Sequence, residues 1–454
     1  MNVSILGTGY VGLTTGACLA FLGHDVTCVD SDVNKIKALE HGEIPFHEPH
    51  LAELVADAKP HLRFTADYND AIPAAQVVFI AVGTPSGAGG APDLKYLESA
   101  ARGVGKHLGD AFTVVVNKST VPIGSGNWVG SLVREAFELR SGSKAKGNFA
   151  VASNPEFLRE GSALLDSLYP DRVVIGADEP QTAEVLYSLY RPILEQNFQP
   201  PPYMGRPDEV AAVPLISTDL ASAELIKYAA NAFLALKISY INEIGQLAEK
   251  VGADIEQVAK GIGLDARIGT RFLQAGIGWG GSCFGKDTAA LVATASEYGL
   301  ESPIVKAARD VNRRQRERVV EKLLGELKIL KGRTIGLLGL AFKPHTDDLR
   351  EAPAIDIARK LIERGARVKV HDPVAMERFK KEQPGLEVLL CESAADVARD
   401  ADALVLVTEW PQYREMEWEP LAKSMRTAIL LDGRHALDRE RMMQAGFRYL
   451  GLSG

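Results

Sequence analysis

A glycine-rich turn near the start of the chain restricts the possible folds most strongly. Residues 3–6 form a short apolar segment, GTGYVG follows at 7–12, and a helix of small residues can run from there to Gly23. The next apolar segment ends in Asp30, eighteen residues after Gly12. This order of strand, turn, helix, strand and acid is the fingerprint of a dinucleotide-binding βαβ unit. The chain should therefore begin with a parallel sheet covered by helices.

Each glycine of this turn has a physical role in such a unit. Gly7 permits the tight turn, Gly9 lets a diphosphate approach the backbone, and Gly12 brings the helix close to the strand. Asp30 would accept hydrogen bonds from a ribose diol and would repel a 2′-phosphate. The pattern predicts NAD rather than NADP as the cofactor, and a glycine turn without a ligand is the structural alternative.

Apolar segments alternate with helical patterns through the first part of the chain, as in a parallel sheet covered on both faces. A proline-rich stretch at 199–203 ends this part. Residues 219–252 contain no proline and favour one helix of about 32 residues, roughly 48 Å long at 1.5 Å per residue. Such a helix is long enough to connect two lobes.

The strand, turn, helix and strand pattern starts again at residue 334. We therefore predict an α/β chain in which two Rossmann-like, doubly wound domains are joined by a long central helix and a small helical domain. The predicted boundaries are 1–203 for the N-terminal NAD-binding domain, 204–325 for the central helical domain with a cysteine loop, and 326–454 for the C-terminal Rossmann-like domain.

The second glycine turn, 336–342, lacks the complete fingerprint. A purely structural turn and a nucleotide site are equally good interpretations of it. Three cations follow predicted strand ends, where open α/β sheets bind ligands: Lys343, Arg350 and Arg434. They form either ordinary exposed surface or a crevice that holds a diphosphate.

Charge and composition exclude several partners and compartments. The formal net charge is −8 and no block of Lys and Arg occurs, which disfavours nucleic acid or an anionic membrane as the main partner. No apolar run reaches the roughly 18 residues of a membrane span, and the N-terminus lacks the basic region of a signal peptide. The four cysteines are far apart, which fits a reducing cytoplasm better than disulfides or a zinc module. No metal site is expected, because Pro49 interrupts the pair His47 and His50 and no third ligand is evident.

One cysteine lies in an unusual loop, GWGGSCFGKD at 278–287. The other three lie in apolar elements and are interpreted as core residues: Cys18, Cys28 and Cys391. Cys283 is surrounded by glycines, which should leave it uncrowded, and it precedes Lys286 and a helix expected at 287–299. These features favour a depressed thiol pKa and a thiolate nucleophile, with a buried inert thiol as the alternative. Asp287 either orients a water or a lysine or caps the helix.

Two further stretches carry polar side chains that suit catalysis. NPEFLREG (154–161) begins with residues that favour a helix start, which would place Glu156 and Glu160 on one helix face. The two glutamates form either a solvated face or a pair that handles a proton and a water. Lys227 and Asn231 share one face of the long helix among apolar residues, so they either extend to solvent or stabilise a developing alkoxide.

Taken together, the chain resembles the UDP-glucose 6-dehydrogenase family of nucleotide-sugar dehydrogenases over essentially its whole length. Seven stretches carry the resemblance: GTGYVG (7–12), VGTP (82–85), KSTVPIG (118–124), NPEFLREG (154–161), ELIKYAANAFLALKISYINE (224–243), GWGGSCFGKD (278–287) and GLAFKPHTDDLRE (339–351). The resemblance implies NAD-dependent, four-electron oxidation of UDP-glucose to UDP-glucuronate through a thiohemiacetal and a thioester on Cys283, with two NADH per turnover. It also implies a C-terminal domain that binds the UDP-sugar and a dimer or higher homo-oligomer assembled through the central domain.

The resemblance assigns roles residue by residue. The implied catalytic residues are Cys283, Lys227, Asn231, Asp287, Thr120 and Glu156. The implied cofactor contacts are Gly7, Gly9, Tyr10, Val11, Gly12, Asp30, Lys35, Thr84, Thr120, Glu160, Lys286 and Arg350. The implied substrate contacts are Glu156, Phe157, Leu158, Lys227, Asn231, Arg267, Phe272, Gly280, Lys343 and Arg434, with Arg267 reaching over from a neighbouring subunit.

Three other functions compete with this interpretation. A sibling enzyme would act on GDP-mannose or UDP-N-acetylmannosamine, and residue types alone do not read out the selectivity of the pocket. A one-hydride β-hydroxyacid dehydrogenase would need neither Cys283 nor a second α/β domain. A catalytically silent nucleotide-sugar-binding protein would have no need of Cys283, Lys227 and Asp287, which are all present.

Overall fold

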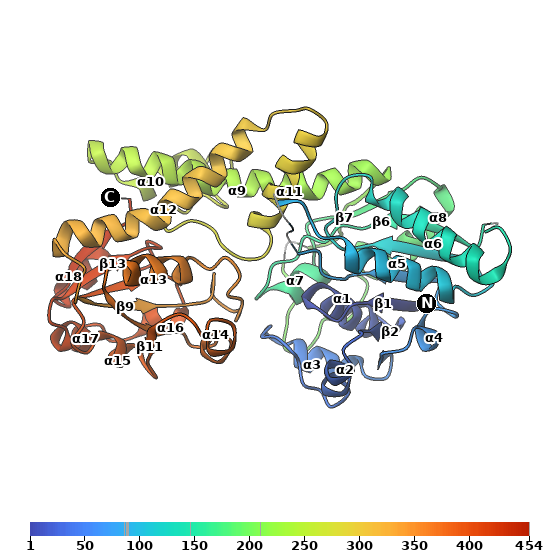
Figure 1. The fold of residues 1–454 in the computed structure, drawn as a ribbon, viewed down its shortest axis with the longest axis horizontal. Helices are drawn as coiled ribbons and strands as arrows, with labels where there is room; N and C mark the ends of the chain where they lie inside the picture. Colours follow the sequence, from blue (N-terminus) through green and yellow to red (C-terminus); the bar gives the residue numbers. More distant parts are fainter. Residues whose placement is uncertain (86, 88–89, 146, 209, 454) are drawn as a thin grey trace. The chain divides into compact units, whose positions relative to one another are not determined.

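The computed structural model describes residues 1–85, 87, 90–145, 147–208 and 210–453. It divides into two compact units, and the labels in Figure 1 identify the elements of each. The first unit comprises Met1–Ala230 and Ala289–Glu297, and the second comprises Asn231–Thr288 and Tyr298–Gly454. Two helices, α9 (Leu220–Val251) and α11 (Phe284–Glu297), have residues in both units. The three domain boundaries expected from the sequence stay a prediction.

The first unit contains an eight-stranded sheet in the order β3-β2-β1-β4-β5-β6-β7-β8. All neighbouring strands are parallel except β6 and β7. The strands are β1 (Asn2–Leu6), β2 (Asp25–Val29), β3 (Leu62–Thr65), β4 (Val77–Ile80), β5 (Thr113–Asn117), β6 (Phe149–Ser153), β7 (Val173–Ala177) and β8 (Leu215–Thr218). The strand order reverses between β1 and β4, and the carboxyl ends of strands at such a point are where open α/β sheets bind ligands.

Helices cover both faces of this sheet, which explains the uninterrupted apolar strands. On β5, Val114 and Val116 belong to one buried cluster and Val115 belongs to another. The first cluster includes residues of α1 (Tyr10–Phe21), α3 (Leu51–Ala58), α7 (Ala163–Leu168) and α8 (Pro180–Glu195). The second includes residues of α4 (Tyr68–Ala71), α5 (Lys95–His107) and α6 (Ser125–Ser141), while α2 (Val33–Glu40) follows β2. The alternation of side chains along each strand therefore supplies two cores.

The second unit contains a six-stranded parallel sheet in the order β11-β10-β9-β12-β13-β14. Its strands are β9 (Thr334–Leu338), β10 (Arg367–His371), β11 (Val388–Leu390), β12 (Ala403–Leu406), β13 (Ile429–Asp432) and β14 (Arg448–Gly451). Its helices are α13 (Pro353–Glu363), α14 (Met376–Glu382), α15 (Ala394–Ala398), α16 (Pro411–Glu415), α17 (Glu419–Ser424) and α18 (Arg439–Gln444). The strand order repeats that of the first six strands of the chain, so the predicted pair of Rossmann-like sheets is confirmed.

The long helix predicted at 219–252 is present as α9, which has 32 residues. Two more helices follow, α10 (Ile255–Gly263) and α12 (Pro303–Leu327). In the second unit, Ile241 and Ala248 of α9 pack with Ile255 of α10 in a small apolar cluster. Among the described residues, no helix combines the length and the apolar character needed to cross a membrane.

Candidate active site

The glycine turn of the first unit joins β1 to α1. Gly7 has a positive φ of 98°, and its amide donates to the carbonyl oxygen of Val29 at 2.8 Å. A Cβ on Gly12 would overlap the carbonyl oxygen of Gly7, whereas a Cβ on Gly9 would meet nothing within 4 Å. No side chain caps the helix end at Gly9. The turn therefore presents a helix N-terminus beside open space, which suits a diphosphate.

Asp30 follows β2 and accepts hydrogen bonds from three residues. Its Oδ2 accepts from the amide and the hydroxyl of Thr8 at 3.0 and 2.7 Å and from Nζ of Lys35 at 2.9 Å. Its Oδ1 accepts from the amide of Asp32 at 3.1 Å. Burial alone would raise the pKa of Asp30, but the hydrogen bonds from Lys35 and Thr8 outweigh it and lower the pKa to about 2. Asp30 is therefore a carboxylate at neutral pH, beside the predicted cofactor contact Lys35.

Thr84 and Thr120 lie beyond the carboxyl ends of the neighbouring strands β4 and β5. The Thr84 hydroxyl donates to the carbonyl oxygen of Thr120 at 2.9 Å. Thr120 lines a small pocket of the first unit together with Lys118, Glu224, Lys227 and Tyr228. The structure thus brings two predicted catalytic residues, Thr120 and Lys227, to one pocket.

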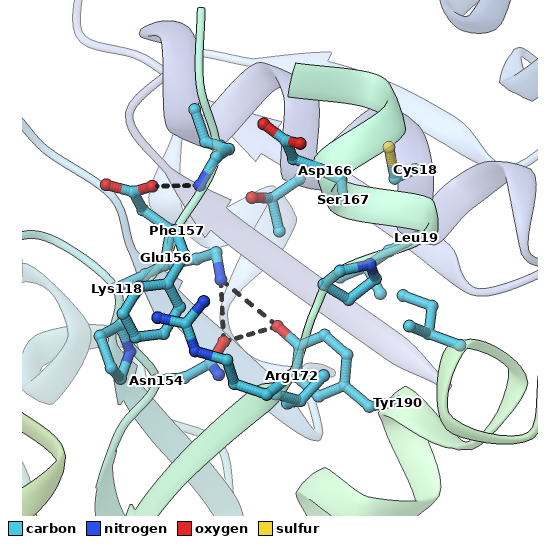
Figure 2. Close-up of a pocket in the computed structure, with 16 residues that line it drawn as sticks. Cys18, Leu19, Lys118, Asn154, Glu156, Phe157, Asp166, Ser167, Arg172 and Tyr190 are labelled. Carbon is cyan, nitrogen blue, oxygen red and sulfur yellow. Dashed lines mark hydrogen bonds between the residues drawn. The ribbon is translucent and has the colours of Figure 1, made fainter. Parts of the chain in front are cut away.

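The segment NPEFLREG at 154–161 is not helical, so the expected helix start is wrong; α7 begins only at Ala163. The reason is that the side chain of Asn154 is used elsewhere. Its Oδ1 accepts from Nζ of Lys118 at 2.9 Å and from the Tyr190 hydroxyl at 2.6 Å, and its Nδ2 donates to the Val174 carbonyl at 2.8 Å. Figure 2 shows the first two of these contacts. Glu156 and Glu160 therefore do not share a helix face.

Glu156 and Lys227 form a buried ion pair. Nζ of Lys227 donates to Oε1 of Glu156 at 2.9 Å and to its carbonyl oxygen at 2.6 Å, and the two side chains are only 5% and 8% exposed. Oε2 of Glu156 accepts from the amide of Leu158 at 2.8 Å. The ring of Phe157 lies 5.4 Å from Nζ of Lys227 and 3.6 Å from the Arg172 guanidinium. Lys227 thus does not extend to solvent but is held at a fixed place by a carboxylate.

The far end of the same segment is connected to the glycine turn. The amide of Gly161, next to the half-buried Glu160, donates to the Tyr10 hydroxyl at 2.8 Å and to Oε2 of Glu48 at 2.5 Å. Oε1 of Glu48 accepts from the amide of Ala163 at 2.7 Å. No sequence pattern indicates this role of Glu48, because it lies in an irregular loop 113 residues before Gly161.

In the second unit, Asp287 organises a polar cluster in the first turn of α11. Its Oδ2 accepts from Nδ2 of Asn231 at 2.6 Å, and its Oδ1 accepts from Nζ of Lys286 at 2.6 Å. Asp287 is 1% exposed, and Asn231 on α9 is also buried. The cluster therefore brings three predicted site residues together next to the cysteine loop.

Cys283 directly precedes α11, and its carbonyl oxygen accepts from the amide of Asp287 at 2.8 Å. It is partly exposed, whereas the other three cysteines are buried as predicted: Cys18, Cys28 and Cys391. Burial raises the pKa of the Cys18 and Cys28 thiols to about 12. Cys283 instead lies at the N-terminal end of α11, and its predicted thiolate character stays a prediction.

The glycines of the cysteine loop lie against other segments of the second unit, whereas Cys283 itself is partly exposed, so its uncrowded setting stays a prediction. A Cβ on Gly281 would lie 2.7 Å from the ring of Phe342, and a Cβ on Gly285 would overlap the carboxylate of Glu351. The amide of Gly281 donates to the Arg350 carbonyl at 2.9 Å. The glycines therefore permit residues 342–351 to pack closely against the loop.

Arg434 connects the same two segments. Its Nε donates to the Val407 carbonyl at 2.7 Å, its Nη1 to the Gly278 carbonyl at 2.9 Å and its Nη2 to the Phe342 carbonyl at 3.3 Å. Gly280 belongs to this packing too, because a Cβ there would lie 2.5 Å from the Glu351 carbonyl oxygen. Arg434 thus holds backbone in place, and its predicted contact with a substrate stays a prediction.

The other predicted residues of the second unit lie around this region or at its surface. Nζ of Lys343 is 5.4 Å from the Phe342 ring centroid, and Arg350 pairs with Asp348 at 2.7 Å. Phe272 has a positive φ of 66°. The Arg267 side chain is 88% exposed and pairs with Asp265, so it extends outward from its own chain.

The residues of the first unit fit a dinucleotide, because open space at Gly9, an uncapped helix end and an ionised Asp30 occur together. Family models match the chain in three parts. Residues 1–194 match the NAD binding domain of the UDP-glucose/GDP-mannose dehydrogenase family, residues 221–314 its central domain and residues 336–439 its UDP binding domain. The chain is thus an NAD-dependent oxidoreductase.

Similarity to known relatives extends over the whole chain. It is 44% identical to a UDP-glucose 6-dehydrogenase of Bacillus subtilis (99% of this chain, 92% of the relative) and 44% identical to one of Rhizobium meliloti (100% and 99%). A solved UDP-glucose dehydrogenase of Pyrobaculum islandicum matches with a TM-score of 0.88 at 39% identity, covering 100% of this chain and 97% of that one. The chain belongs to the UDP-glucose/GDP-mannose dehydrogenase family.

Proposed function

We propose that this chain oxidises UDP-glucose to UDP-glucuronate and reduces two NAD molecules per product. The relatives at 44% identity are UDP-glucose 6-dehydrogenases. The observation that carries the proposal is the place of Cys283, a partly exposed thiol at the start of α11 beside the buried Asp287 cluster. Oxidation of an alcohol to a carboxylate uses a covalent acyl carrier, whereas oxidation to a ketone or an aldehyde does not.

The proposed chemistry balances over four steps. NAD, held by the residues of the first unit, would supply the hydride acceptor for the two oxidations. In the first step the C6 alcohol loses a hydride and releases its hydroxyl proton to water, which gives the aldehyde. In the second step the Cys283 thiolate adds to this aldehyde and forms a thiohemiacetal. In the third step the thiohemiacetal oxyanion loses its C6 hydride and becomes a thioester. In the fourth step water attacks the thioester carbon, the C–S bond breaks, and the carboxylate and the thiol are released. Four electrons leave the sugar, which matches two NADH.

The proposed catalytic side chains have distinct roles in these steps. Lys227 and Asn231 donate to the oxyanion of the thiohemiacetal, because each presents a nitrogen donor one helical turn apart on α9. Glu156 acts as the base for hydrolysis, and Asp287 and Thr120 position the water. The proposed NAD contacts are Gly7, Gly9, Tyr10, Val11, Gly12, Asp30, Lys35, Thr84, Thr120, Glu160, Lys286 and Arg350. The proposed substrate contacts are Phe157, Leu158, Phe272, Gly280, Lys343 and Arg434, together with Glu156, Lys227 and Asn231.

We further propose a homodimer or a higher homo-oligomer assembled through the central helices. Large apolar side chains on α9 support it, because Phe233 and Leu247 are 62% and 60% exposed in the single chain. Arg267 would then contact the substrate of the neighbouring subunit. The cytoplasm is the proposed compartment, since a reducing environment keeps Cys283 as a thiol.

The test is spectrophotometric NADH formation with a panel of nucleotide sugars. UDP-glucose should be the best substrate, with two NADH per UDP-glucose consumed. Cys283→Ser should stop the reaction before free UDP-glucuronate, whereas Cys391→Ser should not change the product. One NADH per turnover, or full product formation by Cys283→Ser, would refute the covalent scheme.

The same panel decides the alternatives. A preference for GDP-mannose or UDP-N-acetylmannosamine would identify a sibling activity within the family. Nucleotide-sugar binding without NADH formation would identify a catalytically silent binding protein. The panel therefore assigns the substrate independently of the mechanism.

A further inference from the structure

A second pocket of the first unit lies along the segment that carries Glu156. Figure 2 shows residues of several elements pointing toward one another around it. Its lining includes Cys18, Lys118, Asn154, Glu156, Arg172 and Tyr190. Lys118 lines both this pocket and the one that contains Thr120 and Lys227, so it stands between the two.

Lys118 is a buried lysine that is 8% exposed. Its Nζ donates to Oδ1 of Asn154 at 2.9 Å and to the Tyr190 hydroxyl at 3.5 Å, and it lies 5.7 Å from the centroid of the Phe79 ring. Burial of an ammonium without a direct carboxylate partner costs several kcal/mol, and a neutral amide would supply the same donor. The positive charge itself therefore calls for an explanation.

Charged and titratable groups face Lys118 from each element packed against it. Among the groups that line a pocket with Lys118, Cys18 lies on α1, Tyr190 on α8 and Lys227 on α9, while Glu156 and Arg172 lie outside helices and strands. Glu224 on α9 lines the pocket of Thr120 as well, and its carboxylate accepts from the amides of Gly124 and Gly126. Burial lowers the pKa of Lys118 to about 8, attraction to Glu156 raises it, and repulsion by Lys227 lowers it. Asp166 in the same pocket is already paired with Arg159 at 2.6 Å. Glu156 is thus the carboxylate on which the charge of Lys118 acts.

We propose that Lys118 is a positioning residue for Glu156: it fixes the start of the segment through Asn154 and supplies a second positive charge behind the Glu156–Lys227 pair. This inference rests on the proposed function of that site. When an oxyanion draws on Lys227, the positive charge of Lys118 still attracts the Glu156 carboxylate and keeps it in place for hydrolysis. In this proposal Lys118 acts through Glu156 and not directly on the substrate or the cofactor.

Three variants separate charge from hydrogen bonding. Lys118→Gln keeps a donor without the charge, Lys118→Met removes both, and Tyr190→Phe removes the other hydrogen bond to the same Asn154 oxygen but keeps the charge. We expect Lys118→Met and Lys118→Gln to lower kcat by about tenfold or more, with KM for UDP-glucose within about threefold of wild type. Tyr190→Phe should keep kcat within about threefold.

The pH profile gives a readout that a merely structural role would not move. Activity that needs protonated Lys118 should fall in the wild type as the pH rises through about 8, where that lysine loses its proton. Lys118→Arg keeps its charge, so it should restore activity and move this decline to higher pH. Lys118→Gln should lack the decline.

Hydrogen exchange of the Leu158 amide, which donates to Glu156, tests the positioning without turnover. It should be faster in Lys118→Met and Lys118→Gln than in Tyr190→Phe. Folded Lys118 variants with wild-type kcat, pH profile and exchange would overturn the inference. Absence of NADH formation by the wild type would instead refute the proposed function, and the exchange data would still decide whether Lys118 positions Glu156.

Discussion

In both Rossmann-like sheets the chain makes the same kind of turn after the first strand, but the two turns present different surfaces. Gly7 and Gly339 have φ values of 98° and 100°, and each amide donates at 2.8 Å to the last residue of the next strand. Two residues further on, Gly9 faces open space, whereas Ala341 is fully buried. Helix α1 begins at once in the first unit, but α13 begins only at Pro353 in the second.

Each sheet also has an aspartate after its second strand, and the aspartate of the second sheet is the more deeply buried of the two. Asp30 is 15% exposed and takes its hydrogen bonds from nearby residues, whereas Asp372 is 1% exposed. The carboxylate of Asp372 accepts from five donors: the amides of Leu340, Ala341, Val374 and Ala375 and Nε1 of Trp410. The amides of Leu340 and Ala341, which could otherwise face a diphosphate, thus donate to Asp372 instead. These bonds support the structural interpretation of the second turn, and its backbone geometry alone does not indicate a dinucleotide site.

The largest expected effect is a loss of stability that distinguishes Asp372 from Asp30. Asp372→Ala leaves buried amides without an acceptor and should lower the free energy of unfolding by about 3 kcal/mol or more. Asp30→Ala should cost less stability but raise KM for NAD about tenfold, because a ribose contact is lost. Denaturant unfolding and NADH kinetics measure the two effects. Equal losses of unfolding free energy in Asp372→Ala and Asp30→Ala would contradict the proposed difference between the two aspartates.

A matched pair of substitutions compares the two turns directly. Gly9→Ala places a methyl group in open space at a φ of −73°, so stability should stay unchanged while KM for NAD rises about tenfold or more. Ala341→Gly removes a buried methyl group, so it should cost about 1 kcal/mol of stability and leave KM for NAD unchanged. The contrast fails if Ala341→Gly weakens NAD binding.

The smallest effect concerns the pH dependence of stability. Hydrogen bonds lower the pKa of Asp30 from 3.8 to about 2, so the folded state favours the carboxylate. Its full contribution, about 2 kcal/mol, is present above about pH 4 and is lost as the pH falls through 2, and about 1 kcal/mol of it is lost by pH 3. The difference in unfolding free energy between wild type and Asp30→Asn should be constant above about pH 5 and shrink below it. A constant difference down to pH 3 would contradict this assignment.

Local sequence patterns predicted the elements well and the tertiary contacts poorly. The glycine turn, the repeated sheet and the 32-residue α9 follow from short-range periodicity and from the absence of proline. The helix expected at Asn154 does not form because Lys118 and Tyr190, which are 36 residues away in either direction, bind that side chain instead. Such long-range hydrogen bonds leave no periodic signal in one sequence.

The cysteine loop is a second case in which the sequence pattern did not predict tertiary contacts. Its glycines indicate a special site, which stays a prediction, and their close neighbours could not be read from the loop itself. Phe342 and Glu351 come from the second sheet's first turn and the segment after it, about sixty residues further along the chain. Arg434 likewise follows a strand end as predicted, but its guanidinium donates to backbone carbonyls of three separate segments and also pairs with Glu409 at 3.4 Å.

The contact of Gly280 with the carbonyl oxygen of Glu351 has an evolutionary consequence. A Cβ at position 280 would lie 2.5 Å from this backbone atom, so no replacement of residue 351 would make room for it. Position 285 differs, because a Cβ there would meet only the end of the exposed, flexible Glu351 side chain, which can move aside. Among homologues, position 280 should therefore stay glycine whatever residue occupies 351, whereas position 285 should accept substitution more readily.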